Sequence, residues 1–515
     1  MLKNIFSVII GTLVLSGIFA FVFANGNKVG TSMILRVAFP YVRAVNEYEP
    51  TKIYFSPEYT FLENTFSPLV ELSPEKGDVV GGVSDDFHWK GNELIFHIRD
   101  GLTTIDGYKI TADDAAFSLK RLLLLSGNTH GNFKDLVCGV AEVKAIDSPC
   151  KGIRVSGNNL ILETKGVKSF LLPMLAAIDF AVIPKRSVDL KTLAITDYRN
   201  TTGAYYVQSD DQHGNIVLKA NPSHFHYSKE MAQEIKLVPS GLDGLPDSRK
   251  QFLDNKVDFI TTIDKLNPEK LIDFAEDHNA VLHSTMNLRT FILIFTKKGI
   301  KKYSVDQRLS IGKTLKTIFR EHFLKSSGYA PTDQVFPSYG DGYLSDDEAA
   351  KLHKQLETVL PSQDVGNAKI AVLRIGDISE FKSKIETTLK GSKVFESSDI
   401  PALTEYKNED DEPEMFIAGP DTGFLEDIGL ISYSINVGLF GLEKNAGEKW
   451  LKEYMAIESK DQRMIKLRKL HIETLESGVA IPLVSAPYVA VARKGWSIGY
   501  SQLFSNDLLW RILKN

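Results

Sequence analysis

The sequence predicts an α/β protein built from two or more lobes. The chain has 515 residues and a mass of 57.4 kDa, which exceeds the length at which a single hydrophobic core stops growing. Runs of strand character alternate with amphipathic helical stretches along the whole chain, and this order predicts mixed sheets covered by helices. Hydrophobic residues make up 43% and charged residues 24% of the chain, a composition typical of a globular protein.

The charge balance argues against a nucleic acid as partner. The chain has 60 Lys and Arg residues against 65 Asp and Glu residues, a formal net charge of -5. No domain-wide basic excess is therefore present to neutralise phosphates.

The N-terminal segment predicts export. Lys3 precedes an apolar run from Ile5 to Ala24, and Val22-Phe23-Ala24 ends that run with small residues suited to cleavage. We expect residues 1–24 to be a cleavable secretory signal. The alternative is an uncleaved anchor, because about 20 apolar residues also span a bilayer. The segment contains no cysteine, which excludes a lipid anchor on an N-terminal cysteine.

The spacing of apolar residues along the chain predicts the principal strands and helices. Short strands are expected where apolar residues alternate or run continuously, and helices where they recur every three to four residues. The expected strands lie at Met33–Pro40, on both sides of the turn at Gly157, at 210–218 as a hairpin, at Leu288–Phe295 and at Lys369–Arg374; the expected helices begin near Tyr59 and Thr111 and span Ser169–Ile178 and Asp306–Phe323.

The stretch from Trp89 to Arg121 holds the densest set of signals. Asn92 to Arg99 alternates in the manner of a half-buried strand. Two Asp-Gly pairs follow, at residues 100–101 and 106–107, and such pairs supply the positive backbone angles of tight turns. Thr111 is then suited to cap a helix whose first turn carries two aspartates. The small and apolar residues of that helix recur on one face, which must dock on another element.

The residue types in this stretch resemble the signature of the peptide/nickel-type (family five) solute-binding proteins of ABC importers. Eleven positions carry the resemblance: Phe96, Arg99, Gly101, Asp106, Gly107, Thr111, Ala112, Asp114, Ser118, Lys120 and Arg121. The chain departs from the family pattern at Thr104, where the family has tryptophan. Looser similarities continue from about Phe66 to the C-terminus.

The resemblance implies a periplasmic binding protein-like fold of type II, similar to cluster C. Such a fold has two mixed-sheet lobes, an extra subdomain and a hinged ligand cleft. Residues 25–66, 196–288 and 481–515 would form lobe I, residues 67–195 the extra subdomain with the signature, and residues 289–480 lobe III.

The same resemblance implies a function in binding and not in catalysis. The protein would lie in the periplasm as a monomer, capture a peptide or similar small solute and deliver it to an ABC transporter permease in the inner membrane, without a cofactor or metal. Three alternatives stay open. The protein could be a sensory or regulatory protein of the same fold, or a hydrolase acting on cell-wall peptides, or a binder of a nickel chelate, an opine or an oligosaccharide.

The resemblance also suggests ligand-binding residues. Peptide binders of this family place an aspartate against the ligand's amino group, and its position here falls on Gly419, so Asp421 is the nearest carboxylate. For the remaining candidates a role in the core or on the surface is the competing interpretation. They are Tyr41, Asn46, Phe133, Phe416 and Tyr488.

Cys138 and Cys150 are the two cysteines of the chain. In an oxidising compartment they could form a disulfide, and the alternative is two separate thiols, because the Cα separation decides between them.

Several enzyme signatures fail on inspection. Gly312-Lys313-Thr314 lacks the glycine that a phosphate-binding loop needs, since position 307 is Gln. Gly340-Asp341-Gly342 is not completed at Ser345 as a dinucleotide fingerprint. His224 and His226 have no third ligand nearby in sequence, so we expect no metal site there.

Overall fold

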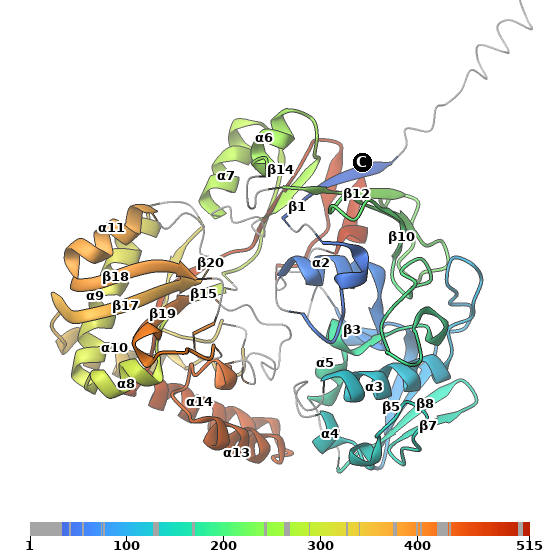
Figure 1. Ribbon diagram of the computed structural model, residues 1–515, viewed down its shortest axis with the longest axis horizontal. Coiled ribbons are helices and arrows are strands. Elements are labelled where there is room, and N and C mark those ends of the chain that lie inside the picture. The colour runs from blue at the N-terminus through green and yellow to red at the C-terminus, as the bar shows by residue number, and fades with distance from the viewer. Residues whose placement is uncertain are drawn as a thin grey trace, which may run out of the picture.

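The computed structural model describes residues 33–515, apart from 41–42, 54–55, 74, 76–77, 127–132, 167–169, 241–244, 262–267, 288, 326–327, 339, 374–378, 398–399, 402–403, 420–430, 432–433 and 503–507. The chain forms two halves, one with the blue to green elements together with the red C-terminal strands, and one with the yellow to orange-brown elements (Figure 1). The expected signal at residues 1–24 lies outside the described residues. No helix in the described ranges is long and apolar enough to cross a membrane.

Lobe I is built on a sheet of seven strands in the order β10-β11-β12-β1-β13-β21-β14. β1 is parallel to β12 and β13, whereas the other pairs are antiparallel. Parallel neighbours need long crossover connections, which is why this sheet collects distant segments. Its strands are β1 (Ile34–Phe39), β10 (Tyr205–Asp210), β11 (Ile216–Ala220), β12 (Glu234–Pro239), β13 (Phe259–Thr261), β14 (Val281–Ser284) and β21 (Val489–Ala492).

The expected strand Met33–Pro40 is confirmed as β1, which runs through the core of lobe I. Leu35, Val37 and Phe39 are buried in one apolar cluster. Helices α6 (Ser248–Leu253) and α7 (Pro268–Asp277) pack with β21 in a second cluster. Helix α2 (Ser56–Thr65) contacts β10. Helices on more than one side thus cover the sheet.

The extra subdomain is built on the antiparallel sheet β5-β6-β8-β7. Helix α3 packs on β7 and β8. The strands are β5 (Ser84–Lys90), β6 (Glu93–Ile98), β7 (Ile153–Ser156) and β8 (Asn159–Glu163), and the helices are α3 (Ala112–Ser126), α4 (Phe133–Leu136) and α5 (Leu171–Leu175).

The strand and the two turns predicted between Trp89 and Gly107 are confirmed. Leu94, Phe96 and Ile98 are all fully buried on one face of β6. Gly101 and Gly107 have φ angles of 78° and 84°, values that residues with a Cβ adopt only under strain.

The cap of α3 differs in one detail from the expectation. The Asp114 carboxylate accepts from both the backbone N–H and the hydroxyl of Thr111, each at 3.0 Å. Reaching back in this way is the second half of a capping box. Asp114 also accepts from the backbone N–H of Lys185 at 2.9 Å, which fixes the helix against the chain that follows β9 (Ala181–Val182).

Lobe III has a six-stranded sheet in the order β16-β20-β15-β19-β17-β18. Its central strands β15 and β19 are buried on both faces, and α9 packs on β20. The strands are β15 (Arg289–Phe295), β16 (Ala330–Pro331), β17 (Asp364–Leu373), β18 (Lys390–Ser397), β19 (Met415–Ala418) and β20 (Ala480–Ala486). The helices are α8 (Lys297–Lys302), α9 (Val305–Phe323), α10 (Asp346–Thr358), α11 (Ser379–Thr388), α13 (Lys444–Met455) and α14 (Lys460–Ser477).

Short pairs of strands complete the described part of the chain. They join segments that border the larger sheets. They are β2 (Ser67–Pro68) with β9, β3 (Val70–Leu72) with β4 (Val79–Gly81), and β22 (Trp496–Ile498) with β23 (Ile512–Lys514).

Two expected boundaries differ from the structure. The lobe boundary drawn at residue 481 falls inside β20, which pairs with β15 and therefore belongs to the sheet of lobe III. The helix expected at Ser169–Ile178 is shorter, since α5 spans Leu171–Leu175. The division of the chain into three parts otherwise stays a prediction, because sheet membership does not by itself define a domain.

Candidate functional site

Two crossover segments join lobe I to lobe III, and they lie side by side. One leads from β14 to β15 and the other from β20 to β21. The backbone N–H of Thr285 donates to the carbonyl oxygen of Tyr488 at 2.9 Å, and the N–H of Tyr488 donates to the Thr285 hydroxyl at 2.8 Å. In hinged proteins the lobes rotate around a few residues at the ends of strands or helices. The segments around Thr285 and Tyr488 have the geometry of a hinge.

The two halves of the molecule also touch away from the crossovers, where Arg463 of α14 meets Phe170, the residue before α5. The guanidinium carbon of Arg463 lies 5.3 Å from the centre of the Phe170 ring, within reach of a cation–π interaction. Arg463 also donates to the carbonyl oxygens of Ile457 and Glu458, both at 2.9 Å. Lobe III and the extra subdomain are thus in direct contact.

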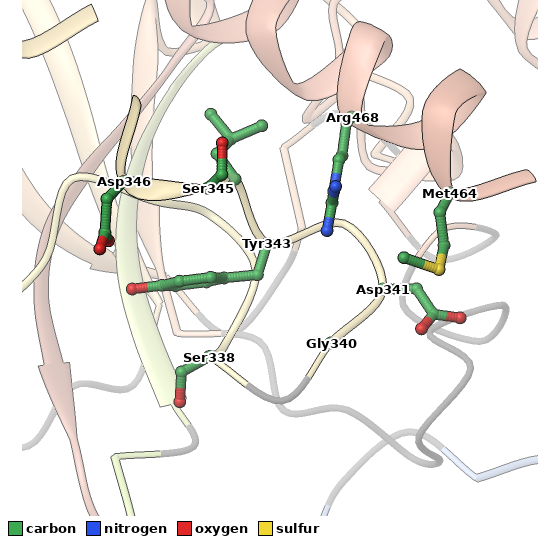
Figure 2. Close-up of a pocket in the computed structure, with 9 residues that line it drawn as sticks. Ser338, Gly340, Asp341, Tyr343, Ser345, Asp346, Met464 and Arg468 are labelled. Atoms are coloured by element: carbon green, nitrogen blue, oxygen red, sulfur yellow. The ribbon is translucent and has the colours of Figure 1, made fainter. Parts of the chain in front are cut away.

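A pocket of about 400 Å³ lies between α14 and the loop 340–346. Met464 and Arg468 line it from the helix, and Asp341 and Tyr343 from the loop. Figure 2 shows the Arg468 side chain directed from α14 toward this loop. Met464 directly follows Arg463, so the pocket adjoins the contact between the two halves. The volume lies in the range of pockets for small molecules.

His471 of α14 fixes the loop that forms this pocket. Its Nε2 accepts from the backbone N–H of Val335 at 3.1 Å. The ring proton must then lie on Nδ1, which donates to the Gly342 carbonyl oxygen at 2.9 Å. Burial lowers the pKa of His471 to about 4. The ring is therefore neutral near pH 7 and makes both hydrogen bonds.

Further contacts hold the same loop. The Gln334 side-chain amide accepts from the Leu344 N–H at 2.6 Å and donates to the Leu344 carbonyl oxygen at 3.2 Å. A Cβ at Gly342 would lie 2.4 Å from the Phe336 ring, so this close approach requires glycine. Ser345 N–H donates to the Glu348 carboxylate at 2.8 Å, as in a capped helix start. The pocket is thus formed before any ligand arrives.

The pocket combines charges of both signs. Arg468 supplies a cation, and Asp341 and Asp346 supply carboxylates. Asp341 forms an ion pair with Lys460 at 3.5 Å, and the side chain of that lysine is half exposed. Within the described ranges no cluster of His, Cys, Asp and Glu could hold a metal ion. The arrangement suits polar recognition of a small charged molecule.

One serine–histidine pair has the appearance of a nucleophile with its base. Ser67 Oγ lies 3.0 Å from His224 Nε2. However, His224 Nδ1 accepts from the backbone N–H of His226 at 3.1 Å, which places the ring proton on Nε2. His224 therefore donates to Ser67 and cannot take its proton. Burial also holds the pKa of His224 well below its usual value.

Comparison with known proteins decides the family. No curated protein matches the sequence. Residues 84–310 match the family described as bacterial extracellular solute-binding proteins, family 5, middle region. Residues 84–310 of the chain thus belong to family 5 of the extracellular solute-binding proteins. The matched range includes the signature that was recognised from Phe96 to Arg121.

Solved structures show the same fold. An oligopeptide-binding protein OppAIV of Borrelia burgdorferi has 18% identity and a TM-score of 0.71, covering 94% of this chain and 100% of its own. OppA of Haemophilus influenzae in complex with RPPGFSPFR has 14% identity and a TM-score of 0.69, covering 94% and 99%. NikA of Brucella suis in complex with Fe(III)-EDTA has 16% identity and a TM-score of 0.70, covering 94% and 100%. The predicted type II periplasmic binding protein-like fold is confirmed.

The predicted ligand-binding residues that the structure describes do not line the pocket in Figure 2. Tyr41 and Asp421 fall outside the described residues. Asn46 is exposed on the short helix η1 (Val45–Glu47). Phe133 is buried against Phe180, and Phe416 is buried within β19. Ligand contact by these residues stays a prediction.

Tyr488, in contrast, lies at the hinge. It is 4% exposed and its backbone forms the two hydrogen bonds with Thr285. The structure thus assigns it a position between the lobes, and contact of its side chain with a ligand also stays a prediction.

The structure gives a reason for glycine at the position of the family's aspartate. A Cβ at Gly419 would lie 2.9 Å from the Phe291 ring and 3.1 Å from Arg289 Cδ. A side chain at Gly419 therefore requires its neighbours to move.

The two cysteines are free in this structure. Cys150 is buried, and its Sγ lies 3.7 Å from the carbonyl oxygen of Cys138. Of the two alternatives drawn from the sequence, the structure shows the separate thiols.

Sequence reasoning missed the pocket residues. Gly340-Asp341-Gly342 resembles only the start of a dinucleotide fingerprint in the sequence, and Arg468 lies more than a hundred residues later in a charged helix. The one local signal was a glycine-rich turn before the capping pair Ser345 and Glu348. Nothing local connects that turn to Arg468.

Proposed function

We propose that this protein is the periplasmic solute-binding component of an ABC importer. It would capture a peptide or peptide-like small solute between lobe I and lobe III and deliver it to a permease in the inner membrane. It would act as a monomer after removal of residues 1–24. Binding and release, with no bond-making step, would be its mechanism.

The observation that carries this proposal is the pair of crossover segments that meet at Thr285 and Tyr488. Two connections allow the lobes to swing about one axis while they remain attached. The contact between Arg463 and Phe170 is one that such a motion makes and breaks. Ligand binding between lobes can then be coupled to a change of the surface that a permease contacts.

The proposed solute class follows from the ligands of structural neighbours and from the residues near Gly419. OppA of Haemophilus influenzae is described in complex with a peptide and NikA of Brucella suis with Fe(III)-EDTA. Position 419 is glycine and has no room for the side chain of an aspartate. Asp421 is therefore proposed as the carboxylate that contacts the ligand's amino group. Tyr41, Asn46, Phe133, Phe416 and Tyr488 are further candidates for ligand contact.

The first test is native mass spectrometry of the protein purified from the periplasm, which detects a co-purified solute. A thermal-shift screen follows with di- to pentapeptides, metal chelates, opines and oligosaccharides. A ligand that binds only the folded protein raises the melting temperature. Small-angle X-ray scattering with and without the ligand then reports whether the lobes close.

We expect a peptide to raise the melting temperature and to reduce the radius of gyration. Asp421→Asn should weaken a peptide with a free amino group more than an acetylated one. A solute that binds without any change in the radius of gyration would contradict capture between the lobes. Binding and closure in a protein with no permease partner would instead favour the sensory or regulatory alternative.

A further inference from the structure

We infer that the pocket between α14 and the loop 340–346 is a second binding site, carried by lobe III alone, for a small zwitterion such as a dipeptide. Arg468 would bind the carboxylate of this ligand, and Asp341 its ammonium group. The inference goes beyond the proposed function, since it does not depend on which solute binds between the lobes.

Arg468 is the main support for an anionic group in the ligand. It lines the pocket, and its Nε is buried without a hydrogen-bond partner among the described residues. A buried N–H that lacks an acceptor is costly, and charged donors are costlier than neutral ones. Guanidinium groups bind carboxylates through two parallel hydrogen bonds. Arg468 already has one acidic neighbour, since its charge contributes to lowering the pKa of Glu348, and a ligand carboxylate would add a second anionic partner on the side that lines the pocket.

The carboxylates of the pocket exclude a simple anion. Asp341 and Asp346 both line the cavity that Arg468 faces. A ligand with a negative charge only would be repelled by them. Lys460 does not remove this effect, because a half-exposed lysine at 3.5 Å contributes little. A ligand with one positive and one negative group matches both parts of the pocket.

The remaining walls suit the apolar part of such a ligand. The Tyr343 ring and the Met464 thioether face the pocket together with the two charged groups (Figure 2). Methionine adapts its shape to varied apolar groups. His471 and Gln334 hold the loop in place, which lowers the entropic cost of binding.

The position of the pocket distinguishes it from the space between lobes I and III. All of its lining residues come from lobe III, so the pocket exists whether or not the lobes close. It adjoins Arg463, which contacts Phe170 of the extra subdomain. A ligand in this pocket is therefore expected to act on the contact between Arg463 and Phe170 through lobe III, and not through the extra subdomain.

The test uses the full protein labelled with ¹³C at its methionine methyl groups. The chain has 8 methionines, and Met464→Leu assigns the pocket resonance. The probe is glycyl-L-leucine, with its C-terminal amide and its N-acetyl derivative as capped controls. We expect glycyl-leucine to shift the Met464 methyl resonance. Each capped form should bind at least about tenfold more weakly.

Variants then test the two charged contacts. Arg468→Gln should abolish the shift, and Asp341→Asn should weaken binding about tenfold. Lys469→Gln is the matched control, since Lys469 lies on the same helix with its side chain 77% exposed, and it should leave binding unchanged. Thermal unfolding of each variant shows whether it is folded.

Two results would overturn the inference. One is a Met464 resonance that glycyl-leucine does not shift in the wild-type protein. The other is equal binding of the capped and uncapped probes, a comparison that needs no variant. Scattering data that show lobe closure with another solute would leave the proposed function standing in either case.

Discussion

Arg121 binds the Glu49 carboxylate through two parallel hydrogen bonds, from Nη1 to Oε1 at 3.0 Å and from Nη2 to Oε2 at 2.5 Å. Arg121 is 1% exposed, and its Nε donates to the Leu193 carbonyl oxygen at 2.8 Å. This contact ties α3 of the extra subdomain to the segment that follows β1 in lobe I. The last residue of the recognised signature therefore has a structural role.

Glu49→Ala should destabilise the protein strongly. It leaves the buried guanidinium without its counterion, and breaking a buried pair in this way costs about 3 kcal/mol of unfolding free energy. The control is Glu473→Ala, which removes an exposed partner 3.8 Å from Lys469 and should cost less than about 0.5 kcal/mol. Urea unfolding measures both, and equal losses would contradict the structural role of Arg121.

Gly312→Ala should destabilise the protein although alanine favours helices. A Cβ at Gly312 in α9 would lie within van der Waals overlap of Ile481 Cδ1 on β20, at 1.9 Å. The overlap should cost about 1–3 kcal/mol, partly offset by about 1 kcal/mol of helix propensity.

Ile481→Val removes the clashing methyl group and provides the matched rescue. The double variant should lose less stability than the sum of the two single variants. Additive losses in thermal or urea unfolding would show that a movement of other residues, and not the loss of the Ile481 methyl group, relieves the clash. The glycine that first suggested a phosphate-binding loop would in either case lie within a packed helix.

Thr285→Val should loosen the hinge. It removes the hydroxyl that accepts from the Tyr488 N–H, and a buried amide without an acceptor costs about 1–3 kcal/mol. Thr285→Ser keeps the hydroxyl and serves as the control. Hydrogen exchange of the Tyr488 amide should accelerate in the valine variant alone, and similar rates in both variants would count against this hydrogen bond.

Stability should fall between pH 6.5 and about pH 4 through His471. Its pKa is about 4 in the folded protein, because burial disfavours the charged ring, against roughly 6.5 when unfolded. The unfolded chain therefore binds more protons in this window. The stabilisation is complete above pH 6.5 and falls by about 3 kcal/mol as the pH approaches 4.

His471→Gln should reduce this pH dependence while lowering stability at pH 7. Burial lowers the pKa values of His224 and His283 as well, so the variant should retain part of the dependence. His213 is exposed, and His213→Gln should behave like the wild type. Urea midpoints from pH 4.5 to 7.5 would check this, and an unchanged dependence in His471→Gln would contradict the neutral buried ring.

The sequence by itself determined the elements whose signals are local. The alternation of Leu94, Phe96 and Ile98 gave β6, and the glycines at 101 and 107 gave the turns that follow it. The apolar run at Leu288–Phe295 gave β15. Periodicity and turn chemistry act over a few residues, so they can be read without the fold. The signature in the same stretch was sufficient to predict the family.

The tertiary structure alone decided how distant segments meet. β20 pairs with β15 across almost two hundred residues, which moved the predicted lobe boundary at 481 into a strand of lobe III. Arg468 faces Asp341 and Tyr343, and Thr285 bonds to Tyr488, over separations that no local period reports. Such contacts depend on the packing of whole sheets and helices, and this is why the hinge and the pocket became visible only in the folded chain.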